Sequence, residues 1–283
     1  MKFRTQIELK KSASPLTLSE RLSAVGSCFS CAIGSRLREG GFDIDVASMG
    51  PLFNPVSIAR TIDRALNGPN FSEADLYADH TGTYHLLWFE STRRGINPAR
   101  LLEDVNRDFD IFSRRLKEAD AWLVTFGTAW CFYHEPTRSI VGNCHKLPDE
   151  EFTRVLYPVN KIVALWENIL EKAPRVIFTV SPVRHLNDGL HGNTLSKAIL
   201  HLAIDHLCRR FPNAEYFPAY EALVDDLRDY RFYADDLKHP SKMAEEYIFE
   251  LFAENYFVSE TRKTVAENRH KHLMTLHRPI IQP

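Results

Sequence analysis

The stretch RLSAVGSCFS, residues 21–30, decides the fold, because an apolar strand changes into a helix across a single glycine. We expect a buried strand at residues 22–26 and a helix at residues 31–39. Gly26 permits the sharp turn between them and places the hydroxyl of Ser27 at the start of the helix. Free backbone N–H groups at such a terminus can hold a developing oxyanion. We therefore predict that Ser27 is a nucleophile; the simpler alternative is an ordinary helix cap.

Four more segments have the length and apolar composition of buried strands, and helical segments separate them. The other strands are expected at residues 42–47, 121–126, 175–180 and 214–217. The other helices are expected at residues 56–66, 98–118, 150–172 and 193–211, with a last one from Met243. Such alternation is typical of a doubly wound sheet with its site at the carboxyl ends of the strands. The sequence thus predicts an α/β fold of three layers, with a five-stranded parallel sheet between helices.

A second stretch, YADDLKHPS at residues 233–241, contains an acid and an imidazole three residues apart. At this spacing Asp236 can reach one ring nitrogen of His239 and leave the other nitrogen to face a nucleophile. Pro240 suits the first position of a new helix, which would hold His239 at its start. Asp235 is the rival carboxylate. A solvated surface loop is the simpler alternative for the whole stretch.

Several motifs together resemble one known family. Residues 26–30 resemble the five-residue signature of the GSCFA family, a branch of the SGNH hydrolase-like proteins, with Ser30 in place of alanine. Further matches are FNP at 53–55, FGTAW at 126–130, GNCHK at 142–146, TVSPVRH at 179–185 and the stretch 236–241. The resemblance covers most of the chain. It implies a flavodoxin-like fold of the SGNH hydrolase type, with Ser27, Asp236 and His239 as a catalytic triad.

The resemblance also implies how an ester would be cleaved. Ser27 would attack the acyl carbonyl, and His239, oriented by Asp236, would accept its proton and pass it to the leaving alcohol. The implied oxyanion donors are the backbone N–H groups of Ser27 and Gly50. Relatives carry an asparagine where this chain has an alanine after its third strand, within Gly127-Thr128-Ala129. Either Asn54, Thr128 or Asn143 replaces that amide, or the oxyanion hole lacks a donor, at a cost of roughly 3 kcal/mol.

Candidate substrate contacts follow the fourth strand and lie in an expected hairpin over the site. Arg184 and His185 could receive an anionic group, although Arg184 could instead pair with the acidic residues Asp225, Asp226 and Asp229. Trp130 and His145 could contact a sugar or an acyl chain, whereas core packing is the simpler role for Trp130.

Three functions are consistent with these residues. The first is a serine ester hydrolase that acts on an O-acyl ester of a carbohydrate, lipid or small metabolite through an acyl-enzyme. The second is an O-acyltransferase with the same triad, and the third is a non-catalytic glycan-binding module. A nucleophilic Cys28 is a minor variant of the first two.

Composition narrows the class of protein. The 283 residues are 44% hydrophobic and 25% charged, with a net charge of −2, which is ordinary for a globular enzyme. We expect no nucleic-acid partner, because no basic face is indicated, and no membrane span, because no apolar run approaches about 20 residues. The charged, alternating N-terminal residues lack an apolar signal core, so we expect a cytoplasmic protein.

The cysteines indicate neither a disulfide framework nor a metal site. They number five and are scattered, and only Cys28 and Cys31 have the spacing of a redox or metal pair. A zinc site needs two more ligands, and Cys144 and His145 are too close in sequence to chelate together. We expect free thiols, no metal and no cofactor.

The chain is expected to form one domain over residues 1–258, with insertions near 71–93 and 130–148. Residues 259–283 are expected to form a C-terminal extension. This extension could pack on a neighbouring copy and form a homo-oligomer, or it could be a partly ordered terminus.

Overall fold

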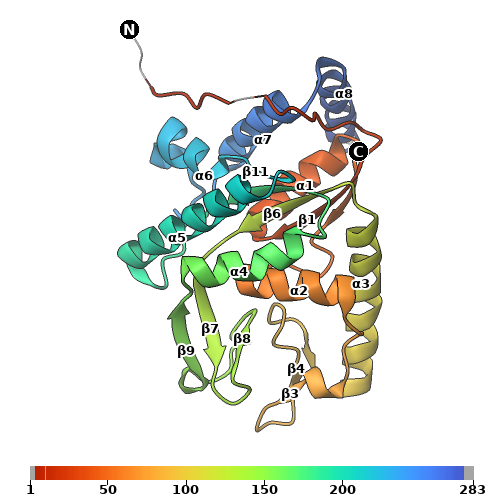
Figure 1. The fold of residues 1–283 in the computed structure, drawn as a ribbon, viewed down its shortest axis with the longest axis vertical. Coiled ribbons are helices and arrows are strands. Elements are labelled where there is room, and N and C mark those ends of the chain that lie inside the picture. The colour runs from red at the N-terminus through yellow and green to blue at the C-terminus, as the bar shows by residue number, and fades with distance from the viewer. Residues whose placement is uncertain (1–3, 10, 277–283) are drawn as a thin grey trace, which may run out of the picture.

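The computed structural model describes residues 4–9 and 11–276, and it places five parallel strands in one sheet between two layers of helices (Figure 1). The strand order is β11-β10-β6-β1-β2, with β1 Arg21–Gly26, β2 Asp43–Val46, β6 Ala121–Phe126, β10 Arg175–Val180 and β11 Ala214–Tyr216. All four neighbouring pairs are parallel. The predicted three-layer α/β/α fold is therefore confirmed.

The strand order determines where a site can form. The chain adds β2 on one side of β1 and then crosses to add β6 on the other side. The loops that leave β1 and β6 therefore diverge to opposite faces of the sheet, and the crevice between them is the usual ligand site of such folds. Ser27 and Gly127 are the first residues after these two strands.

The helices cover both faces of the sheet because side chains alternate along each strand. Trp122, Val124 and Phe126 of β6 face one core, which is closed by α2 Pro55–Asn67, α3 Pro98–Glu118, α4 Val159–Leu170 and α5 Gly189–Arg210. Ala121 and Leu123 face the other core, which is closed by α1 Cys28–Glu39, the short α6 Ala219–Glu221 and α7 Lys242–Tyr256. Helix α7 begins at Lys242 and is capped by Ser241, so Pro240 precedes the cap and does not occupy the first helical position as expected.

The turn after β1 requires a glycine. Gly26 has a φ of 135°, and a Cβ atom at this position would lie 2.2 Å from the carbonyl oxygen of Thr125 in the neighbouring strand. The backbones of β1 and β6 can therefore approach each other at their carboxyl ends only when no side chain lies between them.

The two expected insertions form small antiparallel sheets beside the main domain. The first contains β3 Tyr77–Ala78, β4 Tyr84–His85 and β5 Arg94–Gly95. The second contains β7 Trp130–His134, β8 Ser139–Val141 and β9 Phe152–Leu156. The helix predicted at 150–172 was wrong in its first part, since residues 152–156 pair with β7 and the helix begins only at Val159. Pro158 accounts for the difference, because a proline disfavours helical backbone at the residue before it.

The C-terminal segment belongs to the fold of the chain. Helix α8, Ser259–Leu276, packs on α1 through the buried side chain of Val265, and Asn268 donates to the carbonyl oxygen of Gly40 at 2.9 Å. Arg269 forms an ion pair with Glu246 of α7, with Nη2 and Oε2 2.7 Å apart. Residues 277–283 lie outside the described residues. The homo-oligomer expected from this segment stays a prediction.

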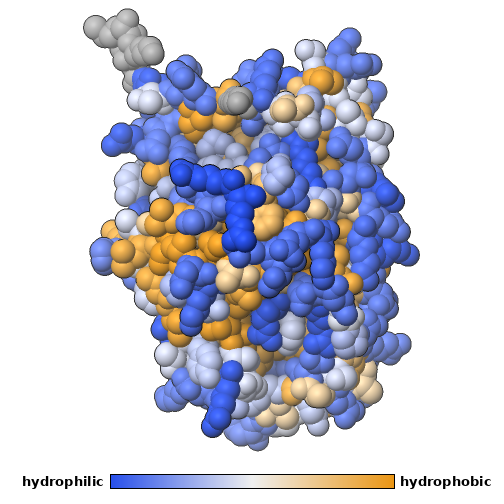
Figure 2. Space-filling view, viewed as in Figure 1, coloured by the Kyte–Doolittle hydropathy of each residue, from blue (hydrophilic) through white to orange (hydrophobic). Residues whose placement is uncertain are grey.

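The outer surface of α5 carries exposed leucines. Leu190, Leu195 and Leu202 are 62%, 40% and 58% exposed, and Figure 2 shows apolar side chains gathered over α4 and α5. Within residues 4–9 and 11–276, no helix combines the length and the apolar character that crossing a membrane requires.

Replacing Gly26 with alanine should destabilise the fold severely. The added Cβ would overlap the Thr125 carbonyl, and a positive φ costs a non-glycine residue a further 1–3 kcal/mol or so. Urea unfolding should show a loss of several kcal/mol, or no folded protein at all. Gly95→Ala is the matched control, since nothing lies within 4 Å of its Cβ position. Equal stability of the two variants would contradict this account of the turn.

Candidate active site

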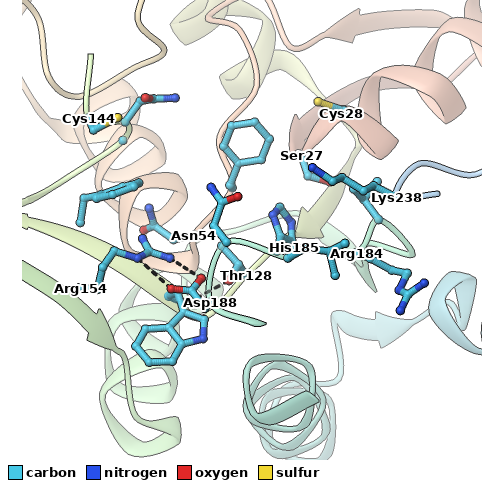
Figure 3. Close-up of a pocket in the computed structure, with 18 of the residues that line it drawn as sticks. Ser27, Cys28, Asn54, Thr128, Cys144, Arg154, Arg184, His185, Asp188 and Lys238 are labelled. Atoms are coloured by element: carbon cyan, nitrogen blue, oxygen red, sulfur yellow. Dashed lines mark hydrogen bonds and ion pairs between the residues drawn. The ribbon is translucent and has the colours of Figure 1, made fainter. Parts of the chain in front are cut away.

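A cavity of about 460 Å³ opens at the carboxyl end of the sheet (Figure 3). Its walls come from the segments that follow β1, β6 and β10, from the start of α2, from the loop before α7 and from the sheet of β7, β8 and β9. The residues that matter for chemistry are Ser27, Cys28, Asn54, Thr128, Trp130, Asn143, Arg154, Arg184, His185, Asp188, Lys238 and His239. The switch point of the sheet thus coincides with a cavity, as predicted for such a fold.

Ser27 lies at the N-terminus of α1, and its hydroxyl forms no hydrogen bond within the described residues. It occupies the N-cap position, but its side chain makes no capping hydrogen bond. The residue is 1% exposed, and its Oγ has no partner among the described residues. Buried hydroxyl groups are normally hydrogen-bonded, so the expected alternative of an ordinary cap does not account for this serine.

Asp236 and His239 form the pair that their spacing predicts. His239 Nδ1 lies 2.6 Å from Asp236 Oδ2, and the backbone N–H groups of His239 and Lys238 donate to Oδ1 at 3.0 and 2.9 Å. Hydrogen bonds from the backbone and side chain of His239 hold the pKa of Asp236 well below its usual range. An ionised carboxylate only accepts, so Nδ1 carries a proton, and in the neutral ring Nε2 is the nitrogen with the free lone pair. No described contact joins Asp235 to His239.

The link between serine and histidine is open in this structure. Ser27 and His239 line the same cavity, yet no hydrogen bond joins Ser27 Oγ to the imidazole. The side chains of His239 and Asp236 are 47% and 45% exposed, so the pair lies on the rim of the cavity while Ser27 lies inside it. Such bonds are often long before a substrate is bound.

The expected backbone oxyanion donors are occupied. The N–H of Ser27 donates to Thr125 at 3.2 Å, and the N–H of Gly50 donates to Ala47 at 2.7 Å. Gly50 also does not line the cavity. The assignment of these two groups was therefore wrong, because the close pairing of β1 with β6 and the turn after β2 each use an N–H. In the described part of the chain, the N–H of Cys28 in the first turn of α1 has no partner.

Asn54 is the best placed candidate to replace the asparagine side chain that is missing at position 129. Its Oδ1 accepts from the N–H of Ser57 at 2.8 Å and caps α2. This bond requires the oxygen to face the helix, so Nδ2 is the atom left over, and it has no partner among the described residues. The side chain is 3% exposed and lines the cavity. The amide oxygen of Asn143 accepts in the same way, from the N–H of His145 at 3.3 Å, but this residue is only partly buried, so Asn54 is the better candidate.

Thr128 has a hydroxyl that is also oriented by its neighbours. Its Oγ1 lies 3.0 Å from Ser196 Oγ and accepts from the N–H of Trp130 at 3.1 Å. Ser196 Oγ in turn accepts from the N–H of Ala129 at 2.8 Å. If Ser196 donates to Thr128, the Thr128 proton is free to point into the cavity.

Lys197 is a buried residue beside the site that the sequence analysis did not identify. It is 2% exposed, and its Nζ donates to the carbonyl oxygens of Gly127 and Ser181, each at 2.7 Å. These carbonyls follow the ends of β6 and β10. Burial lowers the pKa of Lys197 to about 7, and no described carboxylate pairs with it. The sequence feature that could have identified it is its helical spacing with the buried residues of α5, which include Asn193, Ser196, Leu200, Ala203, Ile204 and Leu207.

The expected substrate residues divide into two groups. Trp130 and His185 line the cavity. Burial, followed by the nearby charges of Lys197, His239 and Arg154, lowers the pKa of His185 to about 3, so this ring is neutral. The prediction that His145 contacts the substrate was wrong, because this residue is fully buried and its Nε2 donates to the carbonyl of Phe89 at 3.0 Å. Left-handed backbone at His145, with a φ of 52°, turns that ring inward and leaves Asn143 and Cys144 on the cavity wall.

The cationic residues of the cavity differ in how they are bound. Arg154 makes a two-point ion pair with Asp188 at 2.6 and 3.1 Å and stacks over Phe132 at 4.2 Å. Arg184 lines the cavity, but Figure 3 shows its side chain leading away from Ser27, and its guanidinium lies 5.7 Å from the ring centre of Tyr233. In the described residues it forms no ion pair with Asp225, Asp226 or Asp229.

Residues 4–9 and 11–276 contain no candidate metal site. No group of three or more His, Cys, Asp or Glu residues converges there. The five cysteines are free thiols, and burial raises the pKa of both Cys28 and Cys31. Cys28 is therefore less ready than an ordinary thiol to act as a nucleophile.

Fold and cavity together define the class: a doubly wound α/β/α protein with a serine at its switch point and an aspartate-histidine pair on the rim of the same cavity. A family model described as the GSCFA family matches residues 21–252. The chain therefore belongs to the GSCFA family. No curated protein matches the chain.

Replacing Lys197 with methionine should change how stability depends on pH. The folded-state pKa of about 7 lies below that of an unfolded lysine, about 10.4, so the unfolded chain binds the proton more tightly between these values. Stability of the wild type relative to Lys197→Met should therefore rise with pH across this window, by at most about 1.4 kcal/mol per pH unit. Urea unfolding from pH 6.5 to 9.5 measures the difference.

The matched control is Lys161→Met, which changes an exposed lysine of α4. Its difference from wild type should stay flat over the same range of pH. A flat difference for Lys197→Met as well would show that this lysine keeps an ordinary pKa.

Proposed function

We propose that this protein is a serine ester hydrolase of the SGNH-like type, acting on an O-acyl ester through Ser27, His239 and Asp236. The observation that carries the proposal is the sharing of one cavity by two uncommitted groups. One is the buried hydroxyl of Ser27, and the other is Nε2 of an imidazole whose Nδ1 is bound to a carboxylate. A nucleophile, a base and an orienting acid in this order are the requirement for acyl transfer through a serine.

In the proposed reaction, Ser27 Oγ bonds to the acyl carbon as its proton passes to His239 Nε2. Asp236, ionised because of its low pKa, stabilises the imidazolium that forms. The N–H of Cys28, the Nδ2 of Asn54 and the hydroxyl of Thr128 are the available donors for the oxyanion. The imidazolium then protonates the leaving alcohol as the ester C–O bond breaks. Water attacks the acyl-enzyme with His239 again as base, and Ser27 is released.

The lining of the cavity supports a carbohydrate as one part of the ester. Trp130 and Phe132 offer aromatic surface, and the bound pair of Arg154 and Asp188 offers donors and acceptors beside it. A sugar hydroxyl held there could also replace water, which would make the protein an O-acyltransferase with the same acyl-enzyme. The glycan-binding module needs the same lining but no Ser27 chemistry.

Variants of the three residues test the proposal with short-chain aryl esters. Ser27→Ala and His239→Ala should each lower kcat by at least about a thousandfold, and the double variant should lose little more, because the residues act as a unit. Asp236→Asn should cost far more activity than Asp235→Asn. Full turnover by Ser27→Ala would contradict the proposal. Binding of sugars without any turnover would instead favour the glycan-binding module.

Asn54→Asp tests the oxyanion assignment separately. The carboxylate can still accept from Ser57 and cap α2, but it has no N–H to donate. We expect kcat to fall by about 10²–10³-fold, and urea unfolding separates this loss from the destabilisation that a carboxylate causes at a buried position. Asn97→Asp is the control, because Asn97 caps α3 in the same way, accepting from Arg100 at 3.1 Å, and does not line the cavity. Equal activity of the two variants would remove Asn54 from the oxyanion hole.

A further inference from the structure

A second cleft, of about 380 Å³, lies beside the cavity, and the two share Arg184 as part of their walls. Arg184 follows β10, and the rest of the second cleft comes from α5, α6 and the segment 222–233. Since the Arg184 side chain leads away from Ser27, its charged end belongs more to the second cleft than to the first (Figure 3). An anion bound by Arg184 is therefore expected in this second cleft and not beside Ser27.

Aromatic rings line the second cleft and stay partly exposed. Tyr220, Tyr230 and Tyr233 all contribute, and Tyr230 is 65% exposed. The rings of Tyr230 and Tyr233 lie 5.9 Å apart, and the guanidinium of Arg184 stacks over Tyr233. Exposed tyrosines beside a hollow are typical of surfaces that stack against a ring of a ligand.

Two guanidinium groups in this cleft lack a carboxylate partner. In the described residues neither Arg184 nor Arg228 forms an ion pair, although both line the cleft. The acid in the lining, Asp229, is already engaged, since its carboxylate accepts from the backbone and side chain of Arg231 at 2.9 and 3.2 Å. Unpaired arginines with planar donor groups suit a phosphate or a carboxylate.

The backbone under the cleft is held in an uncommon conformation. Residues Ala222–Leu227 form a π-helical turn, and Arg228, which follows it, has a left-handed φ of 48°. Both features cost free energy and concentrate at binding sites. Here they present Arg228 to the cleft.

We propose that the second cleft is a subsite that binds an anionic ring group, a phosphorylated sugar or a nucleotide part, of the same substrate whose ester lies at Ser27. The tyrosines stack on the ring, and Arg228 and Arg184 bind the anion. Joining the two parts in one substrate rests on the proposed esterase function. Binding of the anionic ring itself does not.

Calorimetry with the Ser27→Ala protein tests the subsite without turnover. The probes are UMP, uridine, glucose 6-phosphate and glucose. We expect at least one phosphorylated probe to bind at least tenfold more tightly than its neutral counterpart, and the tighter of the two identifies the ring. Arg228→Asn, which suits left-handed backbone, and Tyr230→Ala should each weaken that binding at least tenfold.

Arg209→Gln is the control, since Arg209 is exposed on α5 and lines neither cavity. No binding of any probe, equal binding of phosphorylated and neutral probes, or unchanged affinity in both Arg228→Asn and Tyr230→Ala would overturn the subsite. Hydrolysis of neutral aryl esters would survive each of these results. Conversely, a protein without esterase activity could still show the binding.

Discussion

The site depends on one buried lysine side chain held between two strand ends. Lys197 Nζ joins the carbonyls of Gly127 and Ser181, and so ties the segments after β6 and β10 to α5. The same segment after β6 is fixed from the other side, because the carbonyl of Phe53 accepts from both Gly127 and Thr128 at 2.8 and 2.9 Å. Asn54 follows directly and caps α2. One lysine thus fixes the positions of the segments after β6 and β10, which form part of the cavity around Ser27.

The buried Nζ of Lys197 constrains the structure as well as supporting it. Removing a lysine from water is costly unless its donors are bonded, and here two carbonyl oxygens accept from two N–H groups of Nζ. The two carbonyls are therefore held close to one Nζ atom, and neither segment can move alone without leaving an N–H group of Nζ without an acceptor. This rigidity contrasts with the rim, where Asp236 and His239 are half-exposed. The proposed nucleophile is on the rigid side of the cavity, and its base is on the adaptable side.

The sequence was informative where local chemistry determines the outcome. Strands β1, β6 and β10 were predictable because each is a short, mainly apolar segment, and the bond of His239 to Asp236 was predictable from their spacing alone. Strand β9 was not predictable, because its partner β7 ends 18 positions earlier in the chain and only their backbone pairing distinguishes β9 from a helix. The oxyanion donors were not predictable from the sequence either. Which N–H groups stay free depends on the pairing of neighbouring strands, and the burial of His145 depends on a left-handed turn.

The most direct test of the central claim is covalent labelling of Ser27 with a serine-directed fluorophosphonate, followed by peptide mapping. If His239 activates Ser27, the wild type should gain one label, and the label should lie on Ser27. The His239→Ala protein should label at least about a hundredfold more slowly, because the hydroxyl has lost its base. No label at all, a label on another residue, or equal labelling rates in the two proteins would contradict the account.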